Sequence, residues 1–115
     1  MDGELIEIRE FLARLPPFDG LPDEELDGLP RQLGVRYLRR GSPFPPAEQD
    51  EASLWLIRSG AVEFRDADGQ LLEKLGEGEL HADACQDDRS LPEQRGKVVE
   101  DSLFYLLPCG VLHTL

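Results

Sequence analysis

Histidine and cysteine occur in this sequence as two pairs with equal spacing. Three residues separate His81 from Cys85, and three separate Cys109 from His113. Residues four apart share one face of a helix, and four nitrogen and sulfur ligands satisfy the tetrahedral coordination of zinc. The spacing differs from that of standard zinc modules, and strands are expected between the two pairs. A His2Cys2 metal site is therefore kept as an alternative, beside incidental or buried cysteines with surface histidines.

No other motif selects a catalytic chemistry. The sequence lacks a Gly-x-Ser-x-Gly nucleophile motif and a Walker-type lysine, and Gly76-Glu77-Gly78 is too short for a dinucleotide fingerprint. Asp66-Ala67-Asp68-Gly69 is similar to the start of a calcium loop, but its glycine comes too early, so we predict a hairpin turn there. Carboxylates are plentiful, yet nothing pairs two of them at a catalytic distance. We expect a protein that is not an enzyme.

Composition and charge narrow the class of protein. The chain has 115 residues, 40% of them hydrophobic and 31% charged, which indicates one globular domain. Its net charge of -12 disfavours a nucleic-acid partner. No apolar stretch approaches the ~20 residues of a membrane span, and the N-terminus lacks the pattern of a signal peptide. Two cysteines cannot make a disulfide framework. We therefore expect a cytoplasmic location and neither a membrane nor a nucleic acid as partner.

Helices are predicted before residue 30. Apolar residues from Leu5 to Leu15 recur at steps of three and four, and two prolines at 16–17 end this helix. Its apolar stripe is expected to dock on the rest of the domain, with a dimer seam as the alternative. A second short helix is predicted from Pro22, where acidic residues face its N-terminal dipole, to Gly28.

Strands are predicted from Gly34 onward. They are expected at 35–38, 54–57, 61–64, 71–75, 97–99 and 103–107, with loops at 42–52 and 76–95. Ser59-Gly60 is predicted as a turn, and Asp68-Gly69 favours a type I′ hairpin turn. The fold class is α+β and mainly β, in one domain over 1–115. Its parts are a helical segment at 4–30, a roll at 34–107 and the start of a C-terminal helix at 108–115.

Five segments carry a resemblance to a known family. They are 11–22, 39–42, 54–63, 75–80 and 98–103. In this pattern the chain resembles a cyclic nucleotide-binding domain, and more narrowly the N-terminal domain of bacterial signalling proteins with paired CBS modules and a nucleotidyltransferase-like domain. The resemblance implies a small antiparallel β-roll of the double-stranded β-helix (jelly-roll) type, with N-terminal helices and a truncated C-terminal helix. It also implies output domains downstream.

The resemblance places the ligand site in the loop before the last strands. Ligand-binding members carry there an aromatic-Gly-Glu triplet and, further on, an arginine followed by a small residue. The glycine lets backbone amides approach the cyclic phosphate, the glutamate accepts from the ribose, and the arginine pairs with the phosphate. An alignment without gaps places His81-Ala82-Asp83 at the positions of the triplet and Pro92-Glu93 at those of the arginine and the small residue, and two further arginines lie nearby. The candidate ligand-binding positions are His81, Ala82, Asp83, Pro92, Glu93, Arg89 and Arg95.

Every group that the family uses at these positions is altered here. Residues 76–95 also hold six acidic side chains and two arginines, a balance that opposes a phosphate. The first hypothesis is a non-catalytic regulatory domain without a cofactor, whose loop has diverged and which acts on downstream domains, on another protein or on a second copy. The second is a working sensor for cyclic AMP, cyclic GMP or another small ligand, with Arg89 or Arg95 moved into place. The third is a metal-binding module.

Overall fold

The chain folds into one antiparallel sheet with helices at one end. The structure, a computed structural model, describes residues 3–16, 18–46, 52–82, 85 and 96–114. Its strands are β1 (Gly34–Leu38), β2 (Pro43–Phe44), β3 (Ser53–Arg65), β4 (Leu71–Leu75), β5 (Leu80–His81) and β6 (Gly96–Pro108). The strand order is β1-β6-β3-β4, with β2 paired to β6 and β5 paired to β3. The predicted class, α+β and mainly β, is confirmed.

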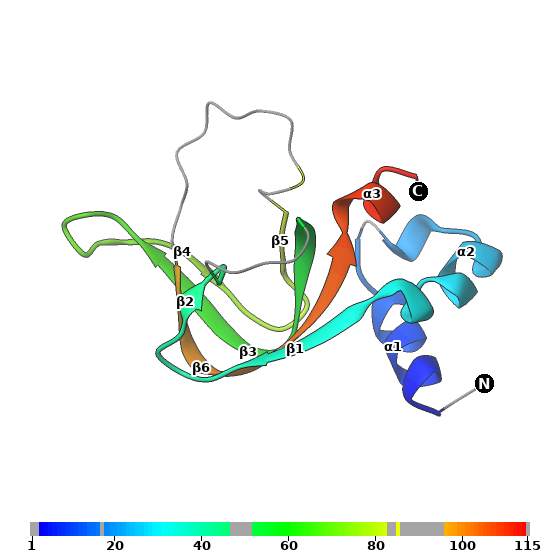
Figure 1. Cartoon of the computed structure of the whole chain (residues 1–115), viewed down its shortest axis with the longest axis horizontal. Helices are drawn as coiled ribbons and strands as arrows, with labels where there is room; N and C mark the ends of the chain where they lie inside the picture. The colour runs from blue at the N-terminus through cyan, green and yellow to red at the C-terminus, as the bar shows by residue number, and fades with distance from the viewer. Residues whose placement is uncertain (1–2, 17, 47–51, 83–84, 86–95, 115) are drawn as a thin grey trace.

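The helices gather at one end of the long axis, and the β3–β4 hairpin lies at the other (Figure 1). They are α1 (Gly3–Ala13), α2 (Asp23–Gly28) and α3 (Cys109–Leu112), with short 3-10 turns η1 (Phe18–Gly20) and η2 (Pro30–Gln32). Arg9 on α1 forms ion pairs with Asp27 and, at 3.3 Å, with Asp23, which ties α1 to α2. Within the described ranges, no helix is long and apolar enough to cross a membrane.

The buried side chains form two clusters on opposite faces of the sheet. The first, here called the helical cluster, consists of Ile8, Leu12, Phe18, Leu26, Leu29, Leu54, Leu56, Cys85, Tyr105 and Leu107. The second, the roll cluster, consists of Phe44, Trp55, Ile57, Val62, Phe64, Leu75, Val98 and Phe104. Residues 54–57 of β3 alternate between the two clusters, because side chains along a strand point to opposite faces. This explains the unbroken apolar run at 54–57, which is typical of a strand covered on both faces.

Docking of α1 on the sheet confirms the preferred prediction for its apolar stripe. Ile8 and Leu12 are buried in the helical cluster beside residues of β3 and β6. The ring of Phe11 meets the ring of Tyr105 edge to face, with centroids 6.0 Å apart. Pro16 lies beyond the helix, as expected from its missing N–H.

The long strands differ from the prediction. The sequence predicts two strands on either side of a turn at Ser59-Gly60, but β3 runs through this point as one bent strand. The register against β6 shifts three times between Ile57 and Val62, so the bend is a series of bulges rather than a hairpin. β6 is likewise continuous where two strands are predicted. Bulges let both strands curl from the helical cluster into the roll cluster.

Two short strands lie inside the segments predicted as loops. β2 lies in the loop predicted at 42–52, and its Phe44 is completely buried in the roll cluster. β5 lies in the loop predicted at 76–95 and pairs Leu80 and His81 with Leu56 and Trp55 of β3. Both strands are two residues long, too short for a periodic pattern to reveal them.

Candidate ligand site

His81 begins the segment that the resemblance assigns to ligand binding. It is the last residue of β5, and only 9% of its surface is exposed. Its ring stacks on Phe64 at a centroid distance of 5.2 Å and meets the edge of Phe44 at 5.3 Å. The side chain at the position of the family's aromatic residue is therefore part of the packed roll.

Beyond His81, the described residues Ala82 and Cys85 make contacts within the protein. The carbonyl of Ala82 accepts a hydrogen bond from the N–H of Cys85 at 2.9 Å. Cys85 forms a disulfide with Cys109, the first residue of α3. The Nε2 atom of His113 lies 3.1 Å from the carbonyl oxygen of Cys85. The segment entering the loop is thus joined to α3 by a covalent bond and a polar contact.

This disulfide is not predicted by the sequence. β5 and β6 both pair with the same stretch of β3, since Trp55 lies opposite His81 on one side and Leu106 on the other. The residues that follow these two strands, Cys85 and Cys109, therefore meet although 24 positions separate them. Because both sulfurs are in the disulfide, the four histidine and cysteine side chains do not form the zinc site considered from their spacing. No cluster of three or more possible metal ligands occurs in the part of the chain that the structure describes.

The other candidate positions lie outside the described residues. They are Asp83, Arg89, Pro92, Glu93 and Arg95. The structure therefore locates His81 and Ala82 and leaves the phosphate-binding part of the hypothesis as a prediction.

Aromatic rings fill the roll beside His81. Phe44 lies at their centre, with centroid distances of 5.3 Å to both Trp55 and Phe104 and 6.0 Å to Phe64. All four rings are at most 1% exposed. These rings act as core in this structure and offer no accessible face on which a base could stack.

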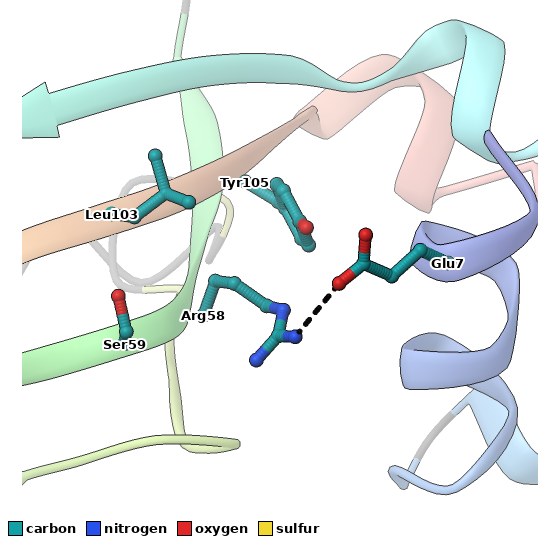
Figure 2. A pocket seen from close by; sticks show the side chains of 5 residues that line it. All are labelled: Glu7, Arg58, Ser59, Leu103 and Tyr105. Atoms are coloured by element: carbon teal, nitrogen blue, oxygen red, sulfur yellow. Dashed lines mark hydrogen bonds and ion pairs between the residues drawn. The ribbon is translucent and has the colours of Figure 1, made fainter. Parts of the chain in front are cut away.

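A shallow groove of about 330 Å³ opens on the other face of the sheet, beside α1 (Figure 2). It is lined by Glu7, Arg58, Ser59, Leu103 and Tyr105. Arg58 pairs with Glu7 at 3.4 Å and with Glu77 at 3.0 Å, and its guanidinium lies 4.5 Å from the centroid of the Phe11 ring. Two carboxylates already neutralise this cation, so Arg58 links α1 to the sheet rather than presenting a ready site for an anion.

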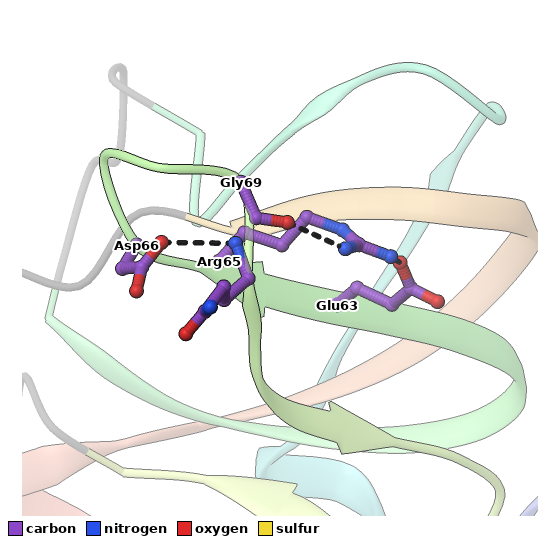
Figure 3. A network of polar contacts seen from close by, with 5 residues as sticks. Glu63, Arg65, Asp66 and Gly69 are labelled. Atoms are coloured by element: carbon purple, nitrogen blue, oxygen red, sulfur yellow. Dashed lines mark hydrogen bonds and ion pairs between the residues drawn. The ribbon is translucent and has the colours of Figure 1, made fainter.

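The acidic turn between β3 and β4 is held by hydrogen bonds between its side chains and its own backbone groups (Figure 3). The carboxylate of Asp66 accepts hydrogen bonds from the N–H groups of Asp68 and Gln70, both at 2.9 Å. Arg65 pairs with Glu63 at 2.9 Å and donates to the carbonyl of Gly69 at 2.8 Å. The predicted hairpin is confirmed, but its turn is not of type I′. Type I′ needs two residues with positive φ, and in this turn only Gly69 has one. A bulge at Phe64/Arg65 and the Asp66 carboxylate make the turn instead.

Asp101, which lies in neither the groove nor the β3–β4 turn, has a shifted pKa. Asp101 on β6 accepts a hydrogen bond from the backbone N–H of Arg40 at 2.8 Å. This bond, with a second from the Tyr37 hydroxyl, lowers the pKa of Asp101. Burial and the same bond to Asp101 raise the pKa of Tyr37. The three groups fasten the end of β1 to β6.

Comparison with known proteins supports the fold. No family model matches the chain, and no curated protein matches it. Many solved structures do match. The cAMP-bound regulatory domain of protein kinase A from Toxoplasma gondii superposes with a TM-score of 0.79 at 14% identity, over 99% of this chain and 45% of that one. A regulatory subunit of a cAMP-independent protein kinase A from Trypanosoma cruzi, bound to guanosine, gives 0.74 at 22%, over 97% and 42%.

A bacterial sensor has the same architecture. The sensor domain of the transcriptional regulator DNR from Pseudomonas aeruginosa superposes with a TM-score of 0.74 at 17% identity, over 92% of this chain and 78% of that one. The fold is that of a cyclic nucleotide-binding domain. The chain spans less than half the length of the kinase regulatory subunits it matches. Identities this low establish the fold and leave the ligand open.

Within the cyclic nucleotide-binding fold, two features near the loop escape sequence reasoning. Phe44 stands among three prolines, so no apolar pattern marks it as core. The pairing of Cys85 with Cys109 depends on which strands flank β3, and the local sequence does not predict this strand order. The equal spacing of the histidine and cysteine pairs is the one available signal, and it points to a metal rather than a disulfide.

Proposed function

We propose that this chain is a non-catalytic regulatory domain in which the cyclic nucleotide-binding fold is kept and the phosphate loop has diverged. The fold neighbours are regulatory and sensor domains rather than catalytic ones, which supports the regulatory part of the proposal. The altered positions at His81, Ala82, Asp83, Pro92 and Glu93 support the divergence. The domain would act through contacts with other domains or proteins, without a cofactor.

The observation that carries this proposal is the internal use of the loop's first residues. His81 packs between Phe44 and Phe64, where it contributes to the core. Cys85 is bonded to α3, so the start of the loop is attached to a neighbouring element. A phosphate site of the family's kind needs exposed amides and an inward-pointing arginine, and neither His81 nor Cys85 serves such a site.

The partners and the location follow from the same proposal. The resemblance to bacterial proteins with CBS pairs and a nucleotidyltransferase-like domain favours domains of the same polypeptide as the first partner. Another protein or a second copy of the chain is the next option. The strongly acidic composition favours neither nucleic acid nor a membrane surface, and we propose a cytoplasmic location.

Titration calorimetry of the whole chain with cyclic AMP and with cyclic GMP tests the proposal. We expect no binding by either nucleotide at low-micromolar concentration. A variant that restores the family's groups, Ala82→Gly, Asp83→Glu, Pro92→Arg and Glu93→Ala, should bind at least about tenfold more tightly, because one charge-assisted arginine contact is worth about 1.5–3 kcal/mol. The matched control carries Pro92→Gln in the same background and should lose that gain. Low-micromolar binding by the unaltered chain would show that the loop still works.

The second candidate function is a small-ligand sensor. The guanosine-bound neighbour favours it, because that regulatory subunit, which contains a domain of this fold, binds a nucleoside that has no phosphate. Such a ligand would not need the missing arginine, and Arg89 and Arg95 would be free for other roles. Titration with guanosine beside the cyclic nucleotides separates the two candidates. Binding of guanosine alone would support the sensor and retain the proposed divergence of the phosphate loop.

A further inference from the structure

The Cys85–Cys109 disulfide joins the segment after β5 to α3. Cys85 lies in the loop after β5, and Cys109 opens α3 directly after β6. α3 has four residues, no buried residue and no side-chain cap. A helix this short is not stable on its own, so contacts with its neighbours must hold it. The disulfide is the covalent one among those contacts.

Among the described residues, two polar contacts and a partly buried apolar face hold α3 beside the disulfide. The N–H of Cys109 donates to the carbonyl of Ala52 at 3.0 Å, and His113 contacts the Cys85 carbonyl. Val111 and Leu112 are only partly buried against the helical cluster. The His113 contact itself depends on where Cys85 is held. Opening the disulfide therefore removes the strongest tie and weakens the second.

The two sulfur-bearing residues differ in exposure. Cys85 belongs to the helical cluster and is 9% exposed, whereas Cys109 is half-buried at the surface. An external thiolate therefore reaches Cys109 first, in whichever compartment the protein resides. Disulfides formed in the cytoplasm are mostly transient, catalytic or redox-sensing, which agrees with the proposed location.

We propose that Cys85 and Cys109 form a thiol–disulfide exchange site that latches the loop after β5 to α3 and opens with a dithiol reductant. A thiolate of the dithiol attacks the sulfur of Cys109, the bond to Cys85 breaks, and Cys85 leaves as a thiolate that takes up a proton. The second thiol of the reductant then attacks the mixed disulfide and releases Cys109. The reductant ends as a disulfide, and the protein gains two electrons and two protons. The latch goes beyond the proposed function: both use the same disulfide as an observation, but nucleotide titration tests the proposed function and reduction by a dithiol tests the latch.

Opening the latch should leave the roll intact. The roll cluster contains neither cysteine, and it holds the only tryptophan, Trp55. Emission from Trp55 therefore reports on the roll independently of α3. The amides of His113 and Thr114, bonded to the carbonyls of Cys109 and Val111, report on α3.

The first test is the rate of reduction by dithiothreitol in native buffer, followed by alkylation and mass measurement. We expect the rate to be proportional to dithiothreitol and to change less than twofold between 0 and 1 M urea, with Trp55 emission constant. A bond reached only by global unfolding would be reduced about fivefold or more faster in 1 M urea. That outcome, or a reduced protein in which excess oxidised glutathione fails to re-form the bond, would overturn the proposal.

The second test is hydrogen exchange of the oxidised and reduced whole chain. We expect His113 and Thr114 to exchange at least tenfold faster after reduction, while Ile57 in the roll cluster changes less than twofold. The double variant Cys85→Ser/Cys109→Ser should match the reduced protein and ignore the reductant. Should that variant fail to fold, the reduced wild-type chain still decides. Unchanged exchange in α3, or equal acceleration at Ile57, contradicts the latch.

Discussion

At Gly60 the backbones of β3 and β6 come closer than any other residue type would allow. A Cβ atom placed there would lie 2.0 Å from the Oγ of Ser102 and 2.7 Å from its Cα. Ser102 is completely buried, and its hydroxyl donates to the carbonyl of Glu100 and accepts from the N–H of Ala61. At this bend, the buried Ser102 hydroxyl occupies the space that a side chain at Gly60 would need.

We predict that Gly60→Ala lowers the free energy of unfolding by about 3–5 kcal/mol, because the Cβ must displace the backbone of β6 as well as the Ser102 hydroxyl. Gly41→Ala is the matched control, since Gly41 also has a positive φ but a Cβ added there would meet nothing within 4 Å. It should cost only about 1–2 kcal/mol, which reflects the backbone conformation alone. Urea denaturation of both variants measures the difference, and equal losses would disprove a steric role for Ser102.

A second residue-scale prediction concerns pH. Hydrogen bonds from Arg40 and Tyr37 lower the pKa of Asp101 in the folded protein. A carboxylate whose folded pKa is depressed stabilises the fold at pH values above its unfolded pKa, and that contribution is lost as the pH falls through the folded pKa. Asp101→Asn should therefore melt at a lower temperature than the parent at pH 7, and the gap should close between about pH 5 and pH 2.

Thermal melts of parent and variant across this pH range check the prediction. Asp19→Asn, at an exposed position on η1, controls for the loss of one negative charge. A gap between Asp101→Asn and the parent that stays constant down to pH 2 would mean that the hydrogen bonds to the carboxylate do not depend on its ionisation.

Which residues can be read from the sequence depends on how local their signal is. The glycines at 60 and 69 are expected at turns, and each has a positive φ. Trp55 stands within the apolar run that predicts a strand at 54–57, and it is 1% exposed. Phe44 has no such neighbours, and its burial arises from pairing with a strand far along the chain. The local sequence identifies the glycines and Trp55, whereas only the pairing of distant strands explains the burial of Phe44.

At the scale of elements, β2 illustrates how much a two-residue strand can contribute. Its pairing with β6 places Phe44 opposite Gly96, among the rings of Trp55, Phe64 and Phe104. The same position puts it against His81, which also stacks on Phe64.

We predict that Phe44→Ala destabilises the protein by about 3–5 kcal/mol, since it removes a buried ring from the centre of an aromatic cluster. Leu72→Ala is the comparison, because Leu72 on β4 is 56% exposed and its truncation should change stability by about 0.5 kcal/mol or less. Urea unfolding monitored by Trp55 emission measures both. Similar losses for the two variants would show that β2 is not part of the cooperative core.

The candidate site is less predictable than the fold, for a reason at the element scale. The segment 81–95 is identified by its place between the last strands, and β5 does lead into it. However, the disulfide and the packing of His81 result from β5 and β6 flanking β3. Strand order emerges from long-range pairing, so a sequence pattern can mark the loop but not what holds it.

At the scale of the whole molecule, the two hydrophobic clusters share their strands. Leu54 and Leu56 of β3 belong to the helical cluster, whereas Trp55 and Ile57 belong to the roll cluster. β6 is divided in the same way, because Tyr105 belongs to the helical cluster and Phe104 to the roll cluster. Neither cluster can come apart without exposing the opposite face of the same strands, so the helices and the roll should unfold as one unit.

Strands shared in this way predict coincident transitions for two probes. Far-UV circular dichroism reports on all secondary structure, and Trp55 emission reports on the roll. With the disulfide oxidised, both should give one midpoint. Leu12→Ala removes a side chain that is 1% exposed in the helical cluster, at a cost of about 2–5 kcal/mol. It should lower both midpoints together by roughly 10 °C, although Leu12 is not part of the roll cluster. If the dichroism transition alone moved, α1 would be a separate layer, and the shared strands would not couple the two faces.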